Sequence, residues 1–440
     1  MNFQKICVLG LGYIGLPTAS TFASHGLKVV GVDIDPHVVE TLRSGEIHIH
    51  EPGLGAVAES AIRSGNLTVS SQPEEADAFL IAVPTPFLQD RMGRYNGRKY
   101  RLADMRAVTS AAEAILPHLR KGNLVVLEST SPPRTTVDLV APILERSGLK
   151  AGSDFFLCYS PERVLPGQIL RELAENARLV GGVSPESARA GRDLYATFVK
   201  GPIMETDATT AEMVKLMENT TRDVNIAIAN EFARLAEKFG VDVWEAVSLA
   251  NLHPRINILN PGPGVGGHCI SVDPWFLVEA APGLTSLIYH ARKVNDDQPY
   301  FVLGKVEQAL GRLKNRRIAA LGLAYKPDVD DLRESPAVEV VRLLQKEGAG
   351  MTAWEPFKPD ADIKDIDMAA TLEEAIEQAD AILLLVNHTQ FREFDPAVVA
   401  QKTPARVVID CVNGWNAAKW ERSGFRIHRL GDNKSTLPGL

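Results

Sequence analysis

A glycine-rich turn near the N-terminus constrains the fold more than any other feature of this 440-residue chain. An apolar stretch over 5–9 is followed by Gly10-Leu11-Gly12-Tyr13-Ile14-Gly15, an apolar helical pattern over 16–24, and a second apolar stretch over 28–32. This order predicts a strand, a tight turn, a helix and a parallel strand, which together begin a doubly wound α/β sheet. Gly10 permits the turn, Gly12 permits close approach of a ligand, and Gly15 permits the helix to pack on the strand.

The same turn predicts the ligand. A helix N-terminus offers free backbone N–H groups and partial positive charge, so it suits the pyrophosphate of a dinucleotide. Asp33 closes the second strand, where a carboxylate accepts hydrogen bonds from the adenosine ribose and repels an additional 2′-phosphate. We therefore expect NAD rather than NADP, bound by these residues: Gly10, Gly12, Tyr13, Ile14, Gly15 and Asp33.

Three further strand patterns, over 78–83, 124–127 and 155–159, each end in a run of proline, serine or threonine. The carboxyl ends of strands in such a sheet face the ligand crevice, which would place Thr85, Thr130 and Glu162 there. Each break alone is also ordinary turn chemistry, but three in succession favour a shared edge. The polar, basic segment over 88–101 predicts a solvated surface loop, with a mobile flap over the cofactor as the alternative.

Length and composition restrict the class of protein. The length predicts about three domains, and 45% hydrophobic with 23% charged residues describes a globular chain with ample core. A formal net charge of −8 argues against a nucleic-acid partner, so an anionic ligand needs locally placed basic groups. The N-terminus enters a strand without a signal peptide, and no apolar run is long enough to span a bilayer. We expect a cytoplasmic protein with no membrane partner.

Three of the four cysteines, Cys7, Cys158 and Cys411, lie in strand-like apolar runs and are expected to be buried. No disulfide framework or metal-ligand spacing occurs, which predicts a reducing compartment and no metal.

The fourth cysteine, Cys269, has a different context. It follows Gly262–Gly267, where four of six residues are glycine, and Asp273 comes four residues after it. Such glycine density indicates a sharp turn or a close approach. A thiol on this loop with a nearby carboxylate suits a nucleophile and its helper. The alternative is an inert, buried thiol on a connector, and spacing alone leaves both open.

The middle of the chain predicts one long helix over 207–240, with Thr209 and Glu212 as a capping box and Gly240 as its end. Polar residues recur along it and form a stripe, which is either a solvated face with an ion pair or a face turned toward a cleft between two domains. The members of the stripe are Lys215, Asn219, Arg222 and Asp223.

A second α/β unit opens near Arg316, with strand patterns over 317–321, 351–354, 381–386 and 407–411. Its first turn lacks the second and third glycines, so it should not hold a dinucleotide. Lys326 and Arg333 follow this turn and suit a diphosphate or carboxylate. The predicted fold is α/β, with two Rossmann-like doubly wound domains joined by a central helical segment with a long helix. The domains would be 1–203 for NAD, 204–305 for the helical segment with the cysteine loop, and 306–440 for the second ligand.

These motifs together resemble the UDP-glucose/UDP-N-acetylmannosamine dehydrogenase superfamily over nearly the whole chain. The stretches 160–167 and 268–276 look most like the UDP-N-acetyl-D-mannosamine dehydrogenases, with UDP-N-acetylglucosamine 6-dehydrogenases as nearest neighbours. Two departures are Arg134, where the family usually has glycine, and the longer segment 88–101. The motifs that carry the resemblance are Gly10–Gly15, Val83-Pro84-Thr85-Pro86, Glu128-Ser129-Thr130, Pro161-Glu162-Arg163, Lys215 with Asn219, Gly266-Gly267-His268-Cys269 and Asp331-Leu332-Arg333-Glu334-Ser335-Pro336.

The resemblance implies a four-electron oxidation of the C6 primary alcohol of a UDP-N-acetylhexosamine to a carboxylate, with NAD as acceptor. Cys269 would form a thiohemiacetal and then a thioester, while Lys215 and Asn219 would stabilise the oxyanions. Asp273 would orient water or take a proton, and Glu162 is a candidate base for hydrolysis; which carboxylate acts in which step stays open.

The resemblance also adds residues to both ligand sites. It implies a homodimer built on the long helix, in which Arg255 reaches the neighbouring subunit's site. Thr85, Thr130 and Arg333 would join the NAD site. The substrate site would comprise Glu162, Arg163, Val164, Lys215, Asn219, Arg255, Asn257, Gly266 and Lys326.

Two rival functions belong to other classes, and UDP-glucose is the rival substrate. A two-electron hydroxy-acid dehydrogenase would not need a cysteine on the glycine loop. A catalytically silent nucleotide-sugar sensor could use the same fold. The joint presence of Lys215, Asn219, Cys269 and Asp273 argues against both.

Overall fold

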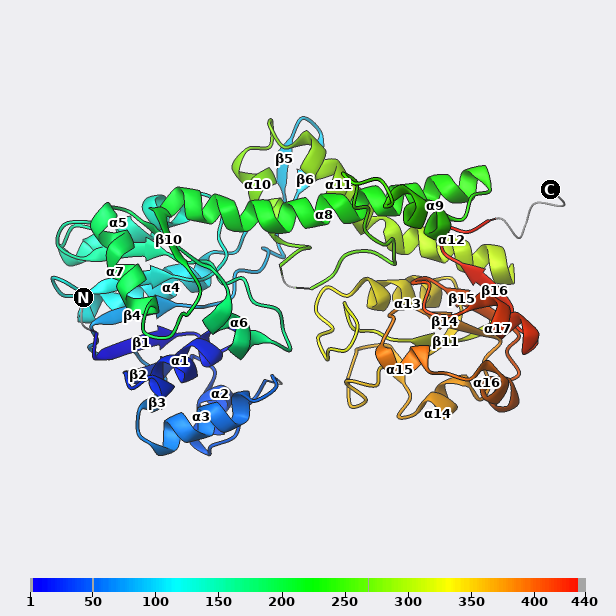
Figure 1. Ribbon diagram of the computed structural model, residues 1–440, viewed down its shortest axis with the longest axis horizontal. Coiled ribbons are helices and arrows are strands. Elements are labelled where there is room, and N and C mark those ends of the chain that lie inside the picture. The colour runs from blue at the N-terminus through cyan, green and yellow to red at the C-terminus, as the bar shows by residue number, and fades with distance from the viewer. Residues whose placement is uncertain (1–2, 50, 268, 434–440) are drawn as a thin grey trace. The chain divides into compact units, whose positions relative to one another are not determined.

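The computed structural model describes residues 3–49, 51–267 and 269–433, and its backbone divides into two compact units (Figure 1). The first unit comprises Met1–Glu218 with Trp275–Thr285, and the second comprises Asn219–Pro274 with Ser286–Leu440. Each unit has its own β-sheet with helices on both faces.

Eight strands form the sheet of the first unit, in the order β10-β9-β8-β7-β4-β1-β2-β3. Strands β3, β2, β1, β4, β7 and β8 are parallel, whereas β9 is antiparallel to β8 and parallel to β10. The parallel strands have the order of a dinucleotide-binding sheet, and their order reverses between β1 and β4. The bounds are β1 Lys5–Leu9, β2 Lys28–Val32, β3 Leu67–Ser70, β4 Ala78–Ile81, β7 Leu124–Leu127, β8 Phe156–Tyr159, β9 Arg178–Gly182 and β10 Ile203–Asp207.

Both faces of this sheet are buried, which explains why its strands are continuous apolar runs rather than alternating patterns. Ile6 and Val8 of β1 pack on one face with side chains of α1 and α3, while Cys7 and Leu9 pack on the other with α4. The helices are α1 Gly15–Ser24, α2 Pro36–Arg43, α3 Leu54–Arg63, α4 Arg106–Ile115, α5 Ala141–Leu144, α6 Ile169–Glu175 and α7 Pro185–Tyr195, with single turns η1 Leu116–His118, η2 Thr136–Val140 and η3 Glu145–Ser147.

Six parallel strands form the sheet of the second unit, in the order β13-β12-β11-β14-β15-β16. This is the same strand order as in the first sheet, with the reversal between β11 and β14. The expected fold of two Rossmann-like domains with a helical segment is therefore confirmed. The bounds are β11 Arg317–Leu321, β12 Gly350–Trp354, β13 Asp367–Met368, β14 Ala381–Leu384, β15 Val407–Asp410 and β16 Arg426–Arg429.

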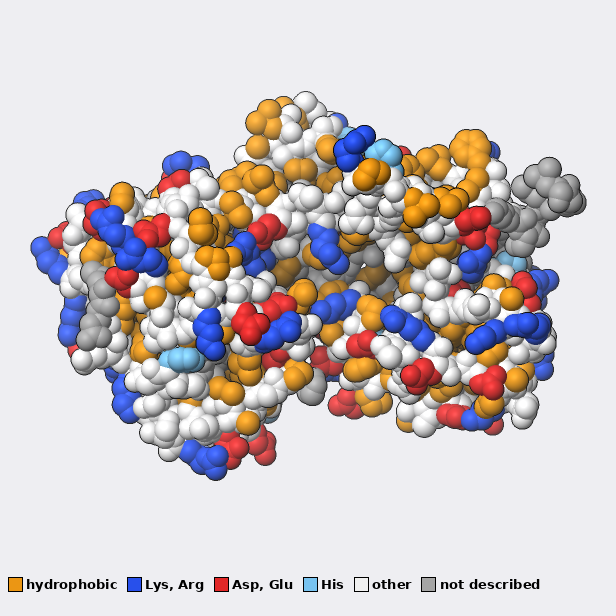
Figure 2. All heavy atoms as spheres, viewed as in Figure 1, with side chains coloured by type: hydrophobic (Ala, Val, Ile, Leu, Met, Phe, Trp, Pro, Cys, Tyr) orange, Lys and Arg blue, Asp and Glu red, His pale blue; other side chains and the backbone are white. Residues whose placement is uncertain are grey.

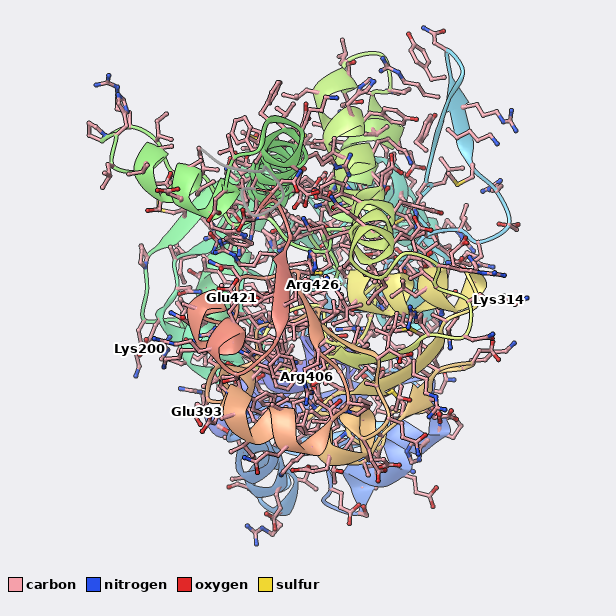
Figure 3. All side chains as sticks on the ribbon, turned by 90° about the vertical axis from the view of Figure 1, so that its right-hand side faces the viewer. Lys200, Lys314, Glu393, Arg406, Glu421 and Arg426 are labelled. Atoms are coloured by element: carbon pink, nitrogen blue, oxygen red, sulfur yellow. The ribbon has the colours of Figure 1, made fainter. Side chains whose placement is uncertain are left out.

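Aliphatic side chains of α12 and α13 cover one face of the second sheet, and an aromatic group covers the other. In that group Trp415 stacks on Trp420 with ring centroids 4.1 Å apart. Charged side chains such as Lys314 and Glu393 point outward (Figure 3). The helices are α9 Val243–Ala250, α11 Ser286–Asp296, α12 Gln298–Leu310, α13 Pro336–Lys346, α14 Leu372–Ile376, α15 Thr389–Arg392, α16 Pro396–Lys402 and α17 Ala417–Arg422.

The long helix α8 spans Ala208–Phe239, as its pattern predicted, but the predicted capping box is wrong. Asp207 caps the helix instead, because its carboxylate accepts hydrogen bonds from the N–H (2.9 Å) and hydroxyl (2.5 Å) of Thr210. Glu212 points away from the helix end and accepts the N–H groups of Arg134 (2.5 Å) and Thr136 (2.7 Å). No helix in the described part of the chain, α8 included, is long and apolar enough to cross a membrane.

The segment over 88–101, expected as an irregular surface loop, contains a β-hairpin. Strands β5 (Gly93–Tyr95) and β6 (Arg98–Tyr100) pair antiparallel around Asn96-Gly97, whose φ angles are 46° and 79°. Two residues at positive φ form the turn that matches strand twist, so this dipeptide was the signal for the hairpin. Its base is fixed by Phe87, which packs edge-to-face on Phe276, and by the Ala103 N–H, which donates to Glu279.

Candidate active site

The three glycines of the first turn have three different steric environments. Gly10 has φ of 91°, and a Cβ on it would lie 2.5 Å from the Ala82 carbonyl oxygen. A Cβ on Gly15 would lie 1.8 Å from the Gly10 oxygen, whereas one on Gly12 would meet nothing within 4 Å. Gly10 and Gly15 therefore permit the packing of turn, strand and helix, and Gly12 faces open space at the start of α1. This cradle fits the pyrophosphate of NAD.

Asp33 directly follows β2 and fixes the same turn. Its carboxylate accepts hydrogen bonds from the N–H of Leu11 (2.9 Å) and of Asp35 (3.0 Å). Tyr13 and Ile14 complete the turn, with Ile14 at the N-terminal end of α1. The acid predicted to contact the ribose is thus held beside the glycines and remains half-exposed.

The carboxyl ends of the neighbouring strands β4 and β7 are joined by side-chain hydrogen bonds. The Thr85 hydroxyl donates to the Thr130 carbonyl oxygen at 2.7 Å, and the Ser129 hydroxyl donates to the Val83 oxygen at 2.7 Å. The structure therefore brings Thr85 and Thr130 together at the edge that the strand breaks predicted. Both belong to the unit that carries the glycine turn.

Glu162 follows β8 and is held at both carboxylate oxygens. Oε1 accepts the N–H of Arg163 at 2.7 Å, and Oε2 lies 2.6 Å from Nη1 of Arg178. Arg163 forms an ion pair with Glu218 on α8 at 2.7 Å, and Val164 packs against the core. Sequence reasoning missed Arg178, because an arginine at the start of an apolar strand gives no signal of its buried partners.

Lys215 and Asn219 lie four residues apart on α8 and so face the same side of the helix. The Lys215 side chain is buried and belongs to the first unit. Asn219 opens the second unit, where its amide donates to the Asp273 carboxylate at 2.6 Å. Two of the predicted catalytic residues, 54 positions apart in the sequence, are therefore in direct contact.

Cys269 is exposed, whereas Cys7, Cys158 and Cys411 are buried, as their apolar context predicted. The Cys269 carbonyl oxygen accepts the N–H groups of Val272 (3.0 Å) and Asp273 (2.8 Å). Cys269 therefore begins the turn that leads into α10 (Asp273–Ala280). The neighbouring His268 lies outside the described residues.

The glycines before Cys269 are required by close approach to another segment of the second unit. A Cβ on Gly266 would lie 2.5 Å from the Glu334 carbonyl oxygen, and one on Gly267 would lie 2.8 Å from the Tyr325 ring. The Gly267 N–H donates to the Arg333 carbonyl oxygen at 3.0 Å. The cysteine loop is thus seated on the segment that follows β11, which also carries Lys326.

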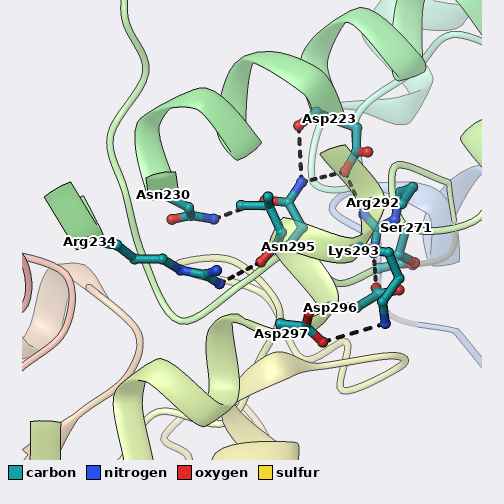
Figure 4. A network of polar contacts seen from close by, with 11 residues as sticks. Asp223, Asn230, Arg234, Ser271, Arg292, Lys293, Asn295, Asp296 and Asp297 are labelled. Atoms are coloured by element: carbon teal, nitrogen blue, oxygen red, sulfur yellow. Dashed lines mark hydrogen bonds and ion pairs between the residues drawn. The ribbon is translucent and has the colours of Figure 1, made fainter. Parts of the chain in front are cut away.

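A buried polar network supports the start of the same loop (Figure 4). Asn230 accepts the Gly262 N–H at 2.9 Å and donates to Asn295 at 2.9 Å. Asn295 in turn donates to Asp223 at 2.8 Å, and Asp223 forms an ion pair with Arg292. The stripe of polar residues predicted on α8 is therefore not one solvated face, since Asp223 is fully buried.

The predicted ligand-binding residues of the second unit remain accessible. Arg255 and Asn257 are exposed between α9 and the cysteine loop. Lys326 is half-buried, with its ammonium 5.8 Å from the Tyr325 ring centroid, and Arg333 pairs with Asp331 at 2.7 Å. Charged groups suited to a diphosphate thus lie beside the cysteine loop.

The turn after β11 has the same geometry as the NAD-type turn, but the acidic residue beside it is not available to a ligand. Gly322 has φ of 84° and donates to Trp354, as Gly10 donates to Val32. Glu355 follows β12 as Asp33 follows β2, but it is fully buried. It accepts the N–H groups of Leu323 and Ala324 and the ring nitrogen of His388 at 3.1 Å. This acid is therefore unavailable to a ribose.

No group of three or more His, Cys, Asp or Glu side chains in the described part of the chain is arranged to hold a metal ion.

Comparison with known proteins gives one consistent result. Three consecutive segments match the domains of one family, the UDP-glucose/GDP-mannose dehydrogenase family: the NAD binding domain over residues 4–199, the central domain over 209–297 and the UDP binding domain over 319–417. Together these segments cover most of the chain.

Individual relatives match over nearly their whole length. UDP-N-acetyl-D-mannosamine dehydrogenase of Methanococcus aeolicus is 45% identical, over 99% of this chain and 97% of that protein. NDP-N-acetyl-D-galactosaminuronic acid dehydrogenase of Ralstonia solanacearum is 47% identical, over 95% and 98%. The solved UDP-D-ManNAc dehydrogenase of Pyrococcus horikoshii superposes with a TM-score of 0.89 at 39% identity, over 98% of this chain and 100% of that chain.

The fold, the NAD-type turn and these matches define an NAD-dependent dehydrogenase that acts on nucleotide sugars. The chain belongs to the UDP-glucose/GDP-mannose dehydrogenase family.

Proposed function

We propose that this enzyme oxidises the C6 alcohol of UDP-N-acetyl-D-mannosamine to the uronic acid, in two successive NAD-dependent oxidations. The observation that carries the proposal is Cys269, an exposed thiol whose loop is seated on a segment with Lys326 and Arg333. The choice of sugar is supported by the relatives that bear this name.

NAD would be held by the first turn, with Asp33 on the ribose and Thr85 and Thr130 at the neighbouring strand ends. It supplies the hydride acceptor for both oxidations. The fit rests on the open space at Gly12 and on the half-exposed carboxylate of Asp33. Arg333 also belongs to the set of residues predicted for NAD.

Cys269 performs the covalent chemistry. After the alcohol is oxidised to the aldehyde, the sulfur adds to the carbonyl carbon and forms a thiohemiacetal. The second oxidation converts this to a thioester, which water hydrolyses to the acid. A thiolate suits this sequence because it adds readily to carbonyls and its thioester remains hydrolysable.

Charge that develops during these steps is stabilised from α8. The ammonium of Lys215 and the amide of Asn219 stabilise the oxyanion of each tetrahedral species. Asp273 holds the Asn219 amide at 2.6 Å, which orients that donor. Glu162 accepts a proton from the water that hydrolyses the thioester.

The remaining predicted substrate residues would contribute to binding of the sugar nucleotide. They are Arg163, Val164, Asn257, Gly266 and Lys326, in addition to the catalytic residues. Arg255 would complete the site of the partner subunit in a homodimer built on α8.

Exposed apolar side chains on α8 and α9 support such a dimer, and Figure 2 shows hydrophobic side chains at the surface around α9. They are Ile228, Phe232, Leu235 and Phe239 on α8, Leu249 on α9 and Leu252 just after α9.

The proposal is tested by a panel of UDP-sugars in which NADH is counted per sugar consumed. UDP-N-acetyl-D-mannosamine should give two NADH and the uronate, at a higher kcat/KM than its gluco epimer or UDP-glucose. The galacto epimer is the second candidate, because a relative named for a galactosaminuronic product is 47% identical. One NADH per sugar, or better turnover of UDP-glucose, would contradict the proposal.

A further inference from the structure

Four buried residues and the half-buried Glu162 form a polar cluster in the first unit, at the edge where β7 and β8 end. Arg178 opens β9, which runs antiparallel to β8 with Tyr159 opposite Gly181. The same register, continued past the end of β8, sets Glu162 opposite Arg178. The members are Glu128 after β7, Ser160 and Glu162 after β8, Arg178 on β9 and Tyr195 at the end of α7.

Arg178 engages a different partner with each side-chain nitrogen. Nη1 lies 2.6 Å from Glu162, Nη2 lies 2.7 Å from Glu128, and Nε donates to the Ser160 hydroxyl at 2.9 Å. The guanidinium also lies over the Tyr195 ring, 3.9 Å from its centroid. The guanidinium is planar and rigid, so these contacts together fix its position.

Glu128 and Glu162 both contact the Arg178 guanidinium, but their surroundings differ. Glu128 is fully buried, and burial raises its pKa to about 7. Its Oε1 accepts from Arg178 and from the Tyr195 hydroxyl at 2.5 Å, while its Oε2 has no hydrogen-bond partner among the residues described. Glu162 accepts hydrogen bonds at both carboxylate oxygens, from the Arg163 N–H and from Arg178, so the position of its carboxylate is fixed.

We propose that Arg178 is a positioning residue for thioester hydrolysis, which fixes the Glu162 carboxylate in place as the proton acceptor, and that Glu128 and Tyr195 hold Arg178 in place. This inference rests on the proposed function. In the step concerned, water adds to the thioester carbon and passes a proton to Glu162. The carbon–sulfur bond then breaks, the Cys269 thiolate leaves with the electron pair, and the product acid releases its proton to solvent. Nothing is oxidised or reduced.

Thioester hydrolysis can be measured separately, because both oxidations precede it. Arg178→Met should complete one round of oxidation, releasing two NADH per site in a burst, and then stall as an acyl adduct on Cys269. Steady-state turnover should fall by about 100-fold or more, the size expected when a proton acceptor is misplaced. Intact-mass analysis during turnover with saturating NAD and UDP-N-acetyl-D-mannosamine detects the adduct.

Two matched variants accompany it. Arg178→Lys restores a charge that reaches one carboxylate but not both, so it should recover part of the rate and show less adduct. Arg189→Met removes an exposed arginine of α7 that pairs only with Glu186 at the surface, and it should behave as the parent enzyme. A purely structural role for Arg178 would lower the melting temperature and the rate without any burst or adduct.

If Arg178→Met does not fold, Tyr195→Phe decides, since it removes only the hydroxyl that holds Glu128. That variant should also accumulate the adduct, at a milder rate loss of about tenfold. A folded Arg178→Met or Tyr195→Phe enzyme that turns over slowly with no adduct would overturn the inference. Failure of the proposed function is seen separately, as a parent enzyme that forms no NADH from any UDP-N-acetylhexosamine.

Discussion

Solvent exposure of the thiol distinguishes the four cysteine residues. Burial raises the pKa of Cys7 to about 11 and also raises those of Cys158 and Cys411, so these thiols stay protonated and unreachable. Cys269 alone among them is exposed. Reaction at a thiol requires both the thiolate and an open path, so Cys269 is the thiol among the four that a reagent can reach without unfolding.

Alkylation should therefore be selective. Treating the native enzyme with iodoacetamide should modify Cys269 and abolish acid formation, while Cys158 reacts only after unfolding; peptide mass mapping checks both. Cys269→Ala should lower acid formation by at least about a thousandfold and still bind NAD and UDP-sugar, because only the nucleophile is lost. Normal acid production by Cys269→Ala would contradict the covalent route.

Asp33 should control cofactor choice. Asp33→Ala removes a charged acceptor worth about 1.5–3 kcal/mol and the repulsion of a 2′-phosphate, so the preference for NAD over NADP should narrow by tenfold or more. Asp35→Ala is the control, because the Asp35 carboxylate caps α2 by accepting the His37 N–H. Comparing kcat/KM for the two cofactors measures the change, and a parent enzyme that already uses both equally would contradict the assignment.

Glu128 should make stability depend on pH. Its pKa is raised from 4.5 to about 7, so the folded state binds this proton more tightly than the unfolded state. The stabilising contribution is present below pH 4.5 and is lost as the pH rises to 7. Glu128→Gln does not titrate and should gain up to about 3 kcal/mol relative to the parent between pH 5 and pH 8. Denaturant unfolding at both pH values measures this, and a constant difference would argue against it.

At the scale of elements, α8 is fixed at its start by a contact that its own sequence does not reveal. Glu212 is fully buried and accepts hydrogen bonds from two N–H groups and one hydroxyl of residues 134–136. One of these donors is the N–H of Arg134, a residue whose φ angle is 72°. Glycine adopts a positive φ more readily than arginine does. Arg134 is accommodated there by its hydrogen bond to Glu212 and its ion pair with Asp138.

Removing this contact should destabilise the protein more than removing a helix cap. Glu212→Ala leaves three donors unpaired in the interior and should cost about 3 kcal/mol or more. Asp207→Ala, which removes the observed cap, should cost about 1 kcal/mol. Thr209→Ala, at the position first expected to cap the helix, should change the unfolding free energy little. Equal losses for Glu212→Ala and Thr209→Ala would contradict this account.

At the scale of the whole molecule, two sheets with the same strand order serve different ligands because their acids differ. Asp33 remains half-exposed beside an open glycine, whereas Glu355 is buried by two N–H groups and His388. The second sheet instead presents Lys326 and Arg333 next to the cysteine loop. Duplication of the fold thus leaves one unit for the dinucleotide and the other suited to an anionic nucleotide.

Complementation tests whether two subunits share a site. Cys269→Ala and Arg255→Ala should each be inactive alone, yet a mixed dimer should regain about a quarter to a half of the parent activity per dimer. One of its sites would carry both defects and the other neither. Mass spectrometry verifies the heterodimer, and a folded heterodimer without activity would place Arg255 in its own subunit's site.

The sequence by itself determined the fold class, the NAD-type turn and the special context of Cys269. These features are local: apolar runs, glycines at fixed spacing and an acid at a strand end report their roles within about thirty residues. The hairpin was not predicted, because its short strands carry little apolar pattern, although the Asn96-Gly97 dipeptide is a local signal for it.

Tertiary structure alone decided what the local patterns left open. The glycines before Cys269 proved to serve contact with Tyr325 and Glu334, and Glu212 proved to serve a distant loop rather than a cap. Arg178 contacts Glu162 and Glu128 only because β7, β8 and β9 are neighbours in the sheet. A buried polar side chain is defined by partners far away in the chain, so its role follows from the packing of strands and not from its neighbours in sequence.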